Sequence, residues 1–211
     1  MNEILISQDW ANLNRFKNEN DSLNINLVEN RVVFMGNSIT QGWIETRPQF
    51  FANKPYIDRG ISGQTTPQML IRFRQDVINL KPKVVVILAG TNDIAGNTGP
   101  STLEMILDNL KSMSEIAKAN GIKVILSSVI PAFDYPWKAG MNPNEKIPAL
   151  NKMIKQYADQ NDKIYLDYFS AMVDARNGLK DELTYDGVHP NEAGYIVMEP
   201  LVEAAIKKAL N

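Results

Sequence analysis

Five runs of apolar residues, separated by helical patterns, constrain the fold of this chain more than any other feature. Three clear runs cover residues 31–35, 84–89 and 123–130, a fourth covers 163–167, and a weaker one covers 55–58. The strong runs are rich in β-branched residues and lack polar alternation, which is typical of strands buried on both faces of a parallel sheet. The sequence therefore predicts a sheet that is covered on both sides.

Helical patterns fill the segments between these runs. Thr66 followed by Pro67 predicts an N-cap and the first position of a helix, and Ser101 with Glu104 has the spacing of a capping box. Further helical spacing covers residues 147–157 and 192–210. Alternating strands and helices require right-handed crossovers, which place helices on both faces of a parallel sheet.

The two ends of the chain and the absence of linkers bear on its organisation. Asp9 is expected to cap a first helix that carries Trp10, within an N-terminal helical segment, residues 1–26. Pro200 predicts a kink or break in the last helix. No shift in composition and no linker divides the chain, so we expect one domain over residues 1–211, on which the N-terminal segment packs.

Composition and charge exclude several classes of site and ligand. The chain has 211 residues, a formal net charge of -2 and no cysteine. Without cysteine, disulfides, thiolate nucleophiles and iron–sulfur clusters are excluded. The charge gives no electrostatic basis for binding nucleic acid.

The N-terminal residues are too short and too acidic a stretch for a signal peptide, and no apolar run approaches the ~20 residues that span a bilayer. We therefore expect a soluble chain without a transmembrane segment. The sequence does not determine the compartment, because a protein of the periplasm or the extracellular space would show the same features once its export signal had been removed. The sequence also leaves the oligomeric state open.

The chain has a single histidine, His189, in the run Asp-Gly-Val-His-Pro that begins at Asp186. Any proton transfer by an imidazole near neutral pH must use this residue. A zinc site with three histidines and an HExxH helix are both excluded. A lone histidine is more often a surface or packed residue than a catalyst, so the surrounding pattern has to decide.

Polar and glycine-rich segments follow directly after three of the apolar runs. Ser38 lies in a strand-to-helix turn, where its hydroxyl is exposed near free amides or simply caps the helix. Gly63 offers either an unobstructed N–H or a positive φ angle. The Asn92 amide either donates to a developing oxyanion or caps the local backbone. In open α/β sheets ligands bind beyond the carboxyl ends of the strands, which is where all three residues are expected.

Four blocks carry a resemblance to a known family: residues 36–40 (GNSIT), 60–63 (GISG), 90–93 (GTND) and 186–190 (DGVHP). In this order they resemble the SGNH hydrolase superfamily, the GDSL-type esterases and lipases. The resemblance implies an α/β fold, a three-layer α/β/α sandwich with a flavodoxin-like parallel sheet of about five strands.

The same resemblance implies a role for each matching residue. Ser38 resembles the nucleophile, His189 the base and Asp186 the acid that orients the base. The N–H groups of Ser38 and Gly63 and the side chain of Asn92 resemble the oxyanion donors. No metal and no organic cofactor is called for.

Asn37 departs from the family pattern, which usually has Asp before the serine. The amide keeps an acceptor oxygen but loses the charge. Because Asn37 is not one of the residues to which the resemblance assigns a catalytic role, we expect the chemistry to survive.

Three aromatic residues are candidates for contact with the substrate, namely Trp43, Tyr135 and Trp137, although such residues more often pack inside a protein. We expect a serine esterase acting on short acyl esters, such as acetyl esters, of carbohydrates or similar polar alcohols. Its substrate would be a small-molecule or glycan ester.

Three alternatives remain open at this point. They are a lysophospholipase or thioesterase for longer acyl chains, a binding module that has lost its activity, and a metallophosphoesterase. The last requires several histidines, which this chain lacks.

Overall fold

A computed structural model describes residues 9–25 and 28–211, and its centre is a parallel sheet of five strands in the order β2-β1-β3-β4-β5. The strands are β1 (Val32–Gly36), β2 (Tyr56–Gly60), β3 (Val84–Leu88), β4 (Lys123–Ser127) and β5 (Ile164–Leu166). This strand order is the flavodoxin-like order of doubly wound sheets. All five predicted runs therefore form strands, and the predicted fold class is confirmed.

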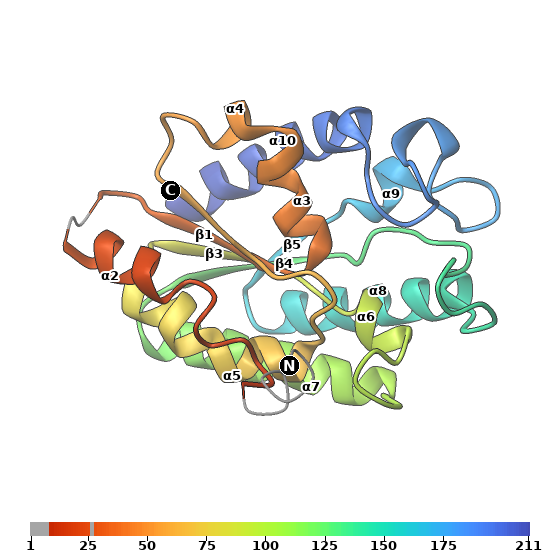
Figure 1. Ribbon diagram of the computed structural model, residues 1–211, viewed down its shortest axis with the longest axis horizontal. Helices are drawn as coiled ribbons and strands as arrows, with labels where there is room; N and C mark the ends of the chain where they lie inside the picture. The colour runs from red at the N-terminus through yellow and green to blue at the C-terminus, as the bar shows by residue number, and fades with distance from the viewer. Residues whose placement is uncertain (1–8, 26–27) are drawn as a thin grey trace.

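Helices cover both faces of the sheet and complete a three-layer arrangement (Figure 1). One face carries α3 (Ser38–Thr46), α4 (Pro48–Phe51), α9 (Phe169–Met172) and α10 (Glu192–Leu210). The other face carries α2 (Lys17–Ile25), α5 (Thr66–Asp76), α6 (Thr91–Ile94), α7 (Leu103–Ala119) and α8 (Pro143–Gln160). Two short 3-10 helices are η1 (Ile78–Leu80) and η2 (Asp181–Leu183).

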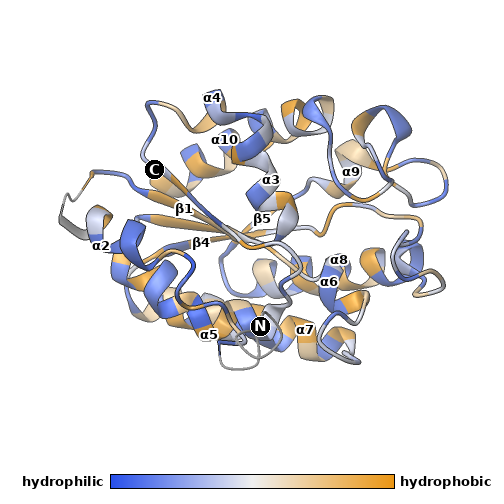
Figure 2. Cartoon of the chain, viewed as in Figure 1, coloured by the Kyte–Doolittle hydropathy of each residue, from blue (hydrophilic) through white to orange (hydrophobic). Residues whose placement is uncertain are grey.

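The apolar strands separate two hydrophobic cores, one under each helical layer. Val32 and Phe34 belong to the core beneath α3 and α10, whereas Val33 and Met35 belong to the core beneath α5, α7 and α8. Successive side chains of a strand point to opposite faces, so a strand buried on both sides must be apolar throughout. Figure 2 shows this as apolar strands between helices whose outer faces are hydrophilic.

Two predicted helix starts are wrong by one residue. Thr65, not Thr66, is the N-cap of α5, because the hydroxyl and the N–H of Thr66 both donate to Asp93, at 2.6 and 3.0 Å. Thr102, not Ser101, caps α7, and its side chain accepts a hydrogen bond from the N–H three residues further on at 3.2 Å. In both cases the cap is a threonine next to the predicted residue.

The N-terminal segment is helical only in part. Of the segment 1–26, residues 1–8 and 26 lie outside the described residues. Asp9 accepts hydrogen bonds from the N–H groups of Leu13 and Asn14 at 2.7 and 3.1 Å, but it organises turns, and the helix α2 begins only at Lys17. At the other end of the chain α10 continues through Pro200 as one helix, so the break predicted there does not occur.

Asp58 is a buried carboxyl on β2, with 7% of the residue exposed. Its Oδ1 accepts the N–H of Gly60 at 2.8 Å, and its Oδ2 has no hydrogen-bond partner among the described residues. Burial raises the pKa of Asp58 to about 7, against the opposite effects of the Gly60 N–H and of the neighbouring Arg59. The folded protein therefore keeps a proton on this carboxyl up to neutral pH.

We expect the effect of Asp58→Asn on the free energy of unfolding to be more favourable at pH 8 than at pH 5. The difference between the two pH values should be roughly 1–3 kcal/mol. The unfolded chain releases the Asp58 proton near the ordinary value of 3.8, and the folded protein releases it near 7. Wild-type stability due to this group is thus present at low pH and is lost as the pH rises between these values. Urea denaturation at both pH values measures the difference, and equal effects of the substitution at pH 5 and pH 8 would contradict the assignment.

Candidate active site

Ser38 is the first residue of α3 and follows β1 after a tight turn. Gly36 is required in this turn, because a Cβ there would collide with the side chain of Thr40. Asn37 is the N-cap of α3, and its Oδ1 accepts the N–H of Ile39 at 3.2 Å. The N–H of Ser38 belongs to the first turn, where amides have no partner within the helix. The cap needs only an acceptor oxygen, so Asn37 fills this role without the charge of the usual Asp.

Ser38, His189 and Asp186 form a continuous chain of hydrogen bonds. The Ser38 Oγ lies 2.9 Å from Nε2 of His189, and Nδ1 of His189 lies 2.7 Å from Oδ2 of Asp186. The serine is 151 positions from the histidine in sequence, so only the fold brings the two groups together. This is the arrangement in which an imidazole removes a proton from a hydroxyl while a carboxylate orients it.

The loop that carries Asp186 is organised around its carboxylate. Oδ1 of Asp186 accepts the N–H groups of Val188 and His189 at 2.9 and 2.7 Å. Partial burial would raise the pKa of Asp186, but the hydrogen bonds from the N–H and ring of His189 and from the Val188 N–H hold that pKa below its ordinary value. Asp186 is therefore ionised at neutral pH and accepts a proton-bearing Nδ1, which leaves Nε2 of His189 as the acceptor facing Ser38.

The loop 61–64 follows β2 beside the nucleophile. β1 and β2 pair in register up to Gly36 and Gly60, and the Ser62 N–H donates to Oε1 of Gln41, on α3, at 3.0 Å. Gly63 has a φ angle of +78°, which favours glycine, and its N–H has no acceptor within the described residues. The expected oxyanion donor is thus an unpaired amide on a loop that is tied to the helix of Ser38.

Asn92 lies at the carboxyl end of β3, within the short helix α6, and is buried. Its Nδ2 donates to the carbonyl oxygen of Gln64 at 3.0 Å, which leaves the second hydrogen of the amide without a partner in the described part of the chain. Asn97 also holds this loop, because its Nδ2 donates to the Gly63 carbonyl at 3.2 Å. The fold therefore links the two expected oxyanion donors, Gly63 and Asn92, through the same loop.

Arg72 is a fully buried residue of α5 that hydrogen-bonds to the carboxyl ends of β1 and β2 and to the loop 61–64. The sequence analysis did not single it out. Its Nη2 donates to the carbonyl oxygens of Gly36 and Arg59 at 3.0 and 2.9 Å, and its Nε donates to Oε1 of Gln64 at 2.6 Å. Asp76 compensates the charge at 3.0 Å. One feature of the sequence could have indicated this role: Arg72 lies on the same buried side of the helix as Met69 and Phe73, where a charged residue is unusual.

Two of the three aromatic candidates do not reach the site. Trp43 is only 1% exposed and stacks on Phe50 and Tyr195 with ring centroids at 5.1 and 5.6 Å, so it belongs to the core. Tyr135 is fully buried, and its hydroxyl donates to the carbonyl oxygen of Thr91 at 3.0 Å. Both interpretations as substrate contacts are wrong, because packing has removed the rings from the surface.

Trp137 does lie at the site, and a second aromatic residue joins it. Trp137 is 45% exposed, stacks on Tyr135 and has its ring centroid 5.9 Å from that of His189. Tyr185, which the sequence analysis missed, is 71% exposed and stacks on His189 at 5.8 Å with an angle of 10° between the rings. Its position directly before Asp186 was the only available signal. The histidine is thus accompanied by two exposed aromatic rings.

Within the described residues, no three His, Cys, Asp or Glu side chains are grouped as a metal ion would require. No helix in that part of the chain is long and apolar enough to cross a membrane.

The model of the GDSL-like lipase/acylhydrolase family matches residues 34–197, a stretch that includes the serine, the loop 61–64, Asn92 and the histidine. The chain belongs to this family. A solved structure of a GDSL-like lipase from Bacteroides thetaiotaomicron superposes with a TM-score of 0.91 and 49% identity, covering 94% of this chain and 98% of that one. Membership in the GDSL-like family confirms the resemblance stated above.

Curated relatives of this GDSL-like protein are more distant. An acetylxylan esterase from Xylanibacter ruminicola is 29% identical over 214 residues, which are 84% of this chain and 43% of that protein. The esterase TesA from Pseudomonas aeruginosa is 27% identical over 163 residues, which are 74% of this chain and 73% of that protein. The chain thus spans less than half the length of the acetylxylan esterase.

Proposed function

We propose that this GDSL-like protein hydrolyses short-chain acyl esters, acetyl esters above all, of carbohydrates or similar polar alcohols, through an acyl-enzyme intermediate on Ser38. The observation that carries the proposal is the chain of hydrogen bonds from Ser38 through His189 to Asp186, at 2.9 and 2.7 Å. It provides a nucleophile, a base within reach of its proton, and a carboxylate that orients the base.

In the first half of the reaction, Nε2 of His189 takes the Ser38 proton as Oγ attacks the ester carbonyl. The N–H groups of Ser38 and Gly63 and the Asn92 amide donate to the oxyanion of the tetrahedral intermediate. The intermediate collapses, the bond to the leaving oxygen breaks, and His189 gives its proton to the departing alcohol. Ser38 then carries the acyl group as an ester.

In the second half, His189 removes a proton from a water molecule, and the resulting oxygen attacks the acyl-enzyme carbonyl. Collapse of the second tetrahedral intermediate releases the carboxylic acid and returns the proton to Ser38. Asp186 stays ionised throughout and stabilises the imidazolium that forms twice in each cycle.

The preference for a polar, ring-shaped alcohol is supported by the surroundings of His189. The imidazole that protonates the leaving alcohol has the exposed rings of Trp137 and Tyr185 beside it. Exposed aromatic faces pack against the C–H face of a sugar while the hydroxyl edge stays solvated. The name of the Xylanibacter relative, an acetylxylan esterase, agrees with this substrate class.

A panel of nitrophenyl esters from acetyl to decanoyl, together with acetylated sugars, tests the proposal. We expect the highest kcat/KM for acetyl esters and stoichiometric labelling of Ser38 by a fluorophosphonate, mapped by mass spectrometry. Faster hydrolysis of decanoyl than of acetyl esters would instead assign a lysophospholipase or thioesterase. A folded protein that hydrolyses none of these esters and takes up no label would be a binding module.

We expect Asn92→Ala to lower kcat by about 10²–10³-fold with little change in KM, because an oxyanion donor acts mainly in the transition state. Steady-state kinetics on nitrophenyl acetate measure both constants. Asn120→Ala is a matched control, since Asn120 lies at the exposed end of α7 and its Nδ2 only donates to the carbonyl of Ile116. A kcat within twofold of wild type in Asn92→Ala would remove Asn92 from the oxyanion hole.

A further inference from the structure

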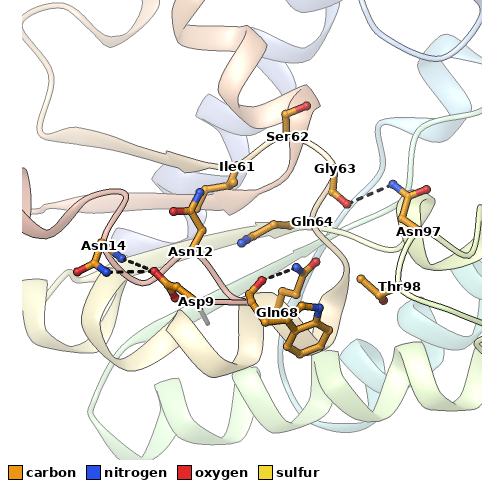
Figure 3. Close-up of a pocket in the computed structure, with 11 residues that line it drawn as sticks. Asp9, Asn12, Asn14, Ile61, Ser62, Gly63, Gln64, Gln68, Asn97 and Thr98 are labelled. Atoms are coloured by element: carbon orange, nitrogen blue, oxygen red, sulfur yellow. Dashed lines mark hydrogen bonds between the residues drawn. The ribbon is translucent and has the colours of Figure 1, made fainter. Parts of the chain in front are cut away.

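A pocket of about 560 Å³ borders the loop 61–64 and is separate from the hydrogen-bonded chain of Ser38 and His189. In Figure 3 the N-terminal residues Asp9, Asn12 and Asn14 lie on one side of it, and Asn97 and Thr98 lie on the other. Gly63, whose N–H the proposed mechanism uses, is part of the lining. The pocket therefore borders the loop that carries one of the expected oxyanion donors.

The wall formed by Asp9, Trp10, Asn12 and Asn14 lies outside the stretch that the family model matches, which begins at residue 34. Two glutamines fasten the wall to the fold. Nε2 of Gln64 donates to the Ala11 carbonyl at 2.8 Å, and Nε2 of Gln68 donates to the Trp10 carbonyl at 2.7 Å. The pocket is thus built before any ligand binds.

The lining of the pocket carries little charge. Among the described residues that line it, Asp9 is the one with a charged side chain. Both oxygens of Asp9 are already occupied, Oδ1 by the Leu13 N–H at 2.7 Å and Oδ2 by the N–H and Nδ2 of Asn14 at 3.1 and 3.2 Å. The carboxylate of Asp9 is therefore engaged by neutral donors of its own segment.

Neutral polar groups are instead available around the pocket. The side-chain amide of Asn12, the hydroxyl of Ser62 and Oδ1 of Asn97 have no hydrogen-bond partner within the described residues. Between them they supply both donors and acceptors. Trp10, which is 42% exposed, adds a large apolar surface to the same lining.

An indole face combined with neutral donors and acceptors matches one class of ligand. A sugar ring has an apolar C–H face and a rim of hydroxyl groups that both donate and accept. Eight of the eleven described residues that line the pocket carry polar side chains, so polar groups interrupt its apolar surface. A long acyl chain would need a continuous apolar surface.

We propose that this pocket is a sugar-binding subsite, which holds a neutral glycosyl unit adjacent to the unit that carries the acyl group, with Trp10 as the stacking platform. The inference rests on the proposed esterase function and extends it from the ester bond to the length of the glycan. The N-terminal segment 9–14 is then a specificity element of the enzyme.

The first test compares acetylated xylo-oligosaccharides of one to four units with nitrophenyl acetate. In the wild type, kcat/KM should rise by about tenfold between the acetylated monosaccharide and the trisaccharide. Trp10→Ala should lower the ratio of kcat/KM for the trisaccharide to that for nitrophenyl acetate by about tenfold, mainly through KM, and Trp10→Phe should retain much of it. Leu13→Ala is the control, because Leu13 belongs to the same segment but does not line this pocket.

Asn12→Gly removes the free amide and suits the backbone, because Asn12 has a φ angle of +55°, where glycine is tolerated better than alanine. It should lower the same ratio by a smaller factor than Trp10→Ala. A ratio unaffected by Trp10→Ala would overturn the subsite while leaving the esterase function intact.

A second test does not depend on turnover. In the Ser38→Ala background, titration with unacetylated xylotriose and cellotriose by calorimetry should show binding that the additional change Trp10→Ala weakens about tenfold. Absence of binding by both sugars, or binding that does not depend on Trp10, would overturn the subsite. If the wild type hydrolyses no ester, the proposed function fails, and this titration still decides whether the pocket binds a sugar.

Discussion

Ser38→Ala is expected to lower kcat for ester hydrolysis by at least ~10⁴-fold and to abolish labelling by a fluorophosphonate. In the proposed mechanism the Oγ of Ser38 forms the acyl-enzyme, and it lies 2.9 Å from the single histidine of the chain. The variant retains the N–H of residue 38, Gly63 and Asn92, so a small residual rate over water is expected from the oxyanion donors.

Folding and specificity controls separate a catalytic from a structural loss. Within the described residues the Ser38 hydroxyl has a single hydrogen-bond partner, Nε2 of His189 at 2.9 Å, so its removal should leave the thermal midpoint close to that of the wild type. Ser112→Ala is the matched control. Ser112 lies on α7, outside the four sequence blocks of the site, and its hydroxyl donates to the Asp108 carbonyl of the same helix. Full labelling of Ser38→Ala would show that another serine is the nucleophile.

The strands could be predicted because each lies in one continuous apolar run. The exception is β2, where the weak run reflects the charged residues Asp58 and Arg59 in the strand. Arg59 is tolerated because Asn20 of α2 accepts from its Nε and Nη2 at 3.0 and 2.8 Å. A pattern of apolar residues cannot indicate that a buried charge has such a distant partner.

The first residues of the helices also depend on contacts with distant parts of the chain. Whether Thr65 or Thr66 caps α5 depends on Asp93, which lies 27 positions away and accepts both donor groups of Thr66. Burial raises the pKa of Asp93 to about 6, while the hydrogen bonds from Thr66 act in the opposite direction. Local patterns therefore find a helix but not the long-range contact that sets its first residue.

The candidate site residues could be named from the four sequence blocks, but the sequence did not show which of the nearby aromatic residues are buried and which are exposed. Trp43 and Trp137 look equivalent in sequence, yet one is buried and the other is 45% exposed beside the histidine. The position of Trp43 four residues after Ile39, both on the buried side of α3, was the signal for the core. Trp137 stacks on Tyr135 and lies beside the histidine, and no sequence pattern indicates either contact.

His189→Ala is expected to lower kcat by at least ~10⁴-fold, as much as Ser38→Ala, and the double variant should be no slower than either single variant. In the proposed mechanism the two residues act as one unit, because the hydroxyl is a weak nucleophile without the base and the base has no proton to remove without the hydroxyl. The chain has no second histidine that could take over this role.

Single-turnover measurements with nitrophenyl acetate on the four proteins, wild type, Ser38→Ala, His189→Ala and the double variant, give the coupling directly. Losses that multiply in the double variant would mean that serine and histidine act in separate steps. Losses that do not multiply are expected from the geometry, since the 2.9 Å contact between Oγ and Nε2 is the element that both substitutions remove. The remaining rate then belongs to substrate binding and to the oxyanion donors, which neither substitution touches.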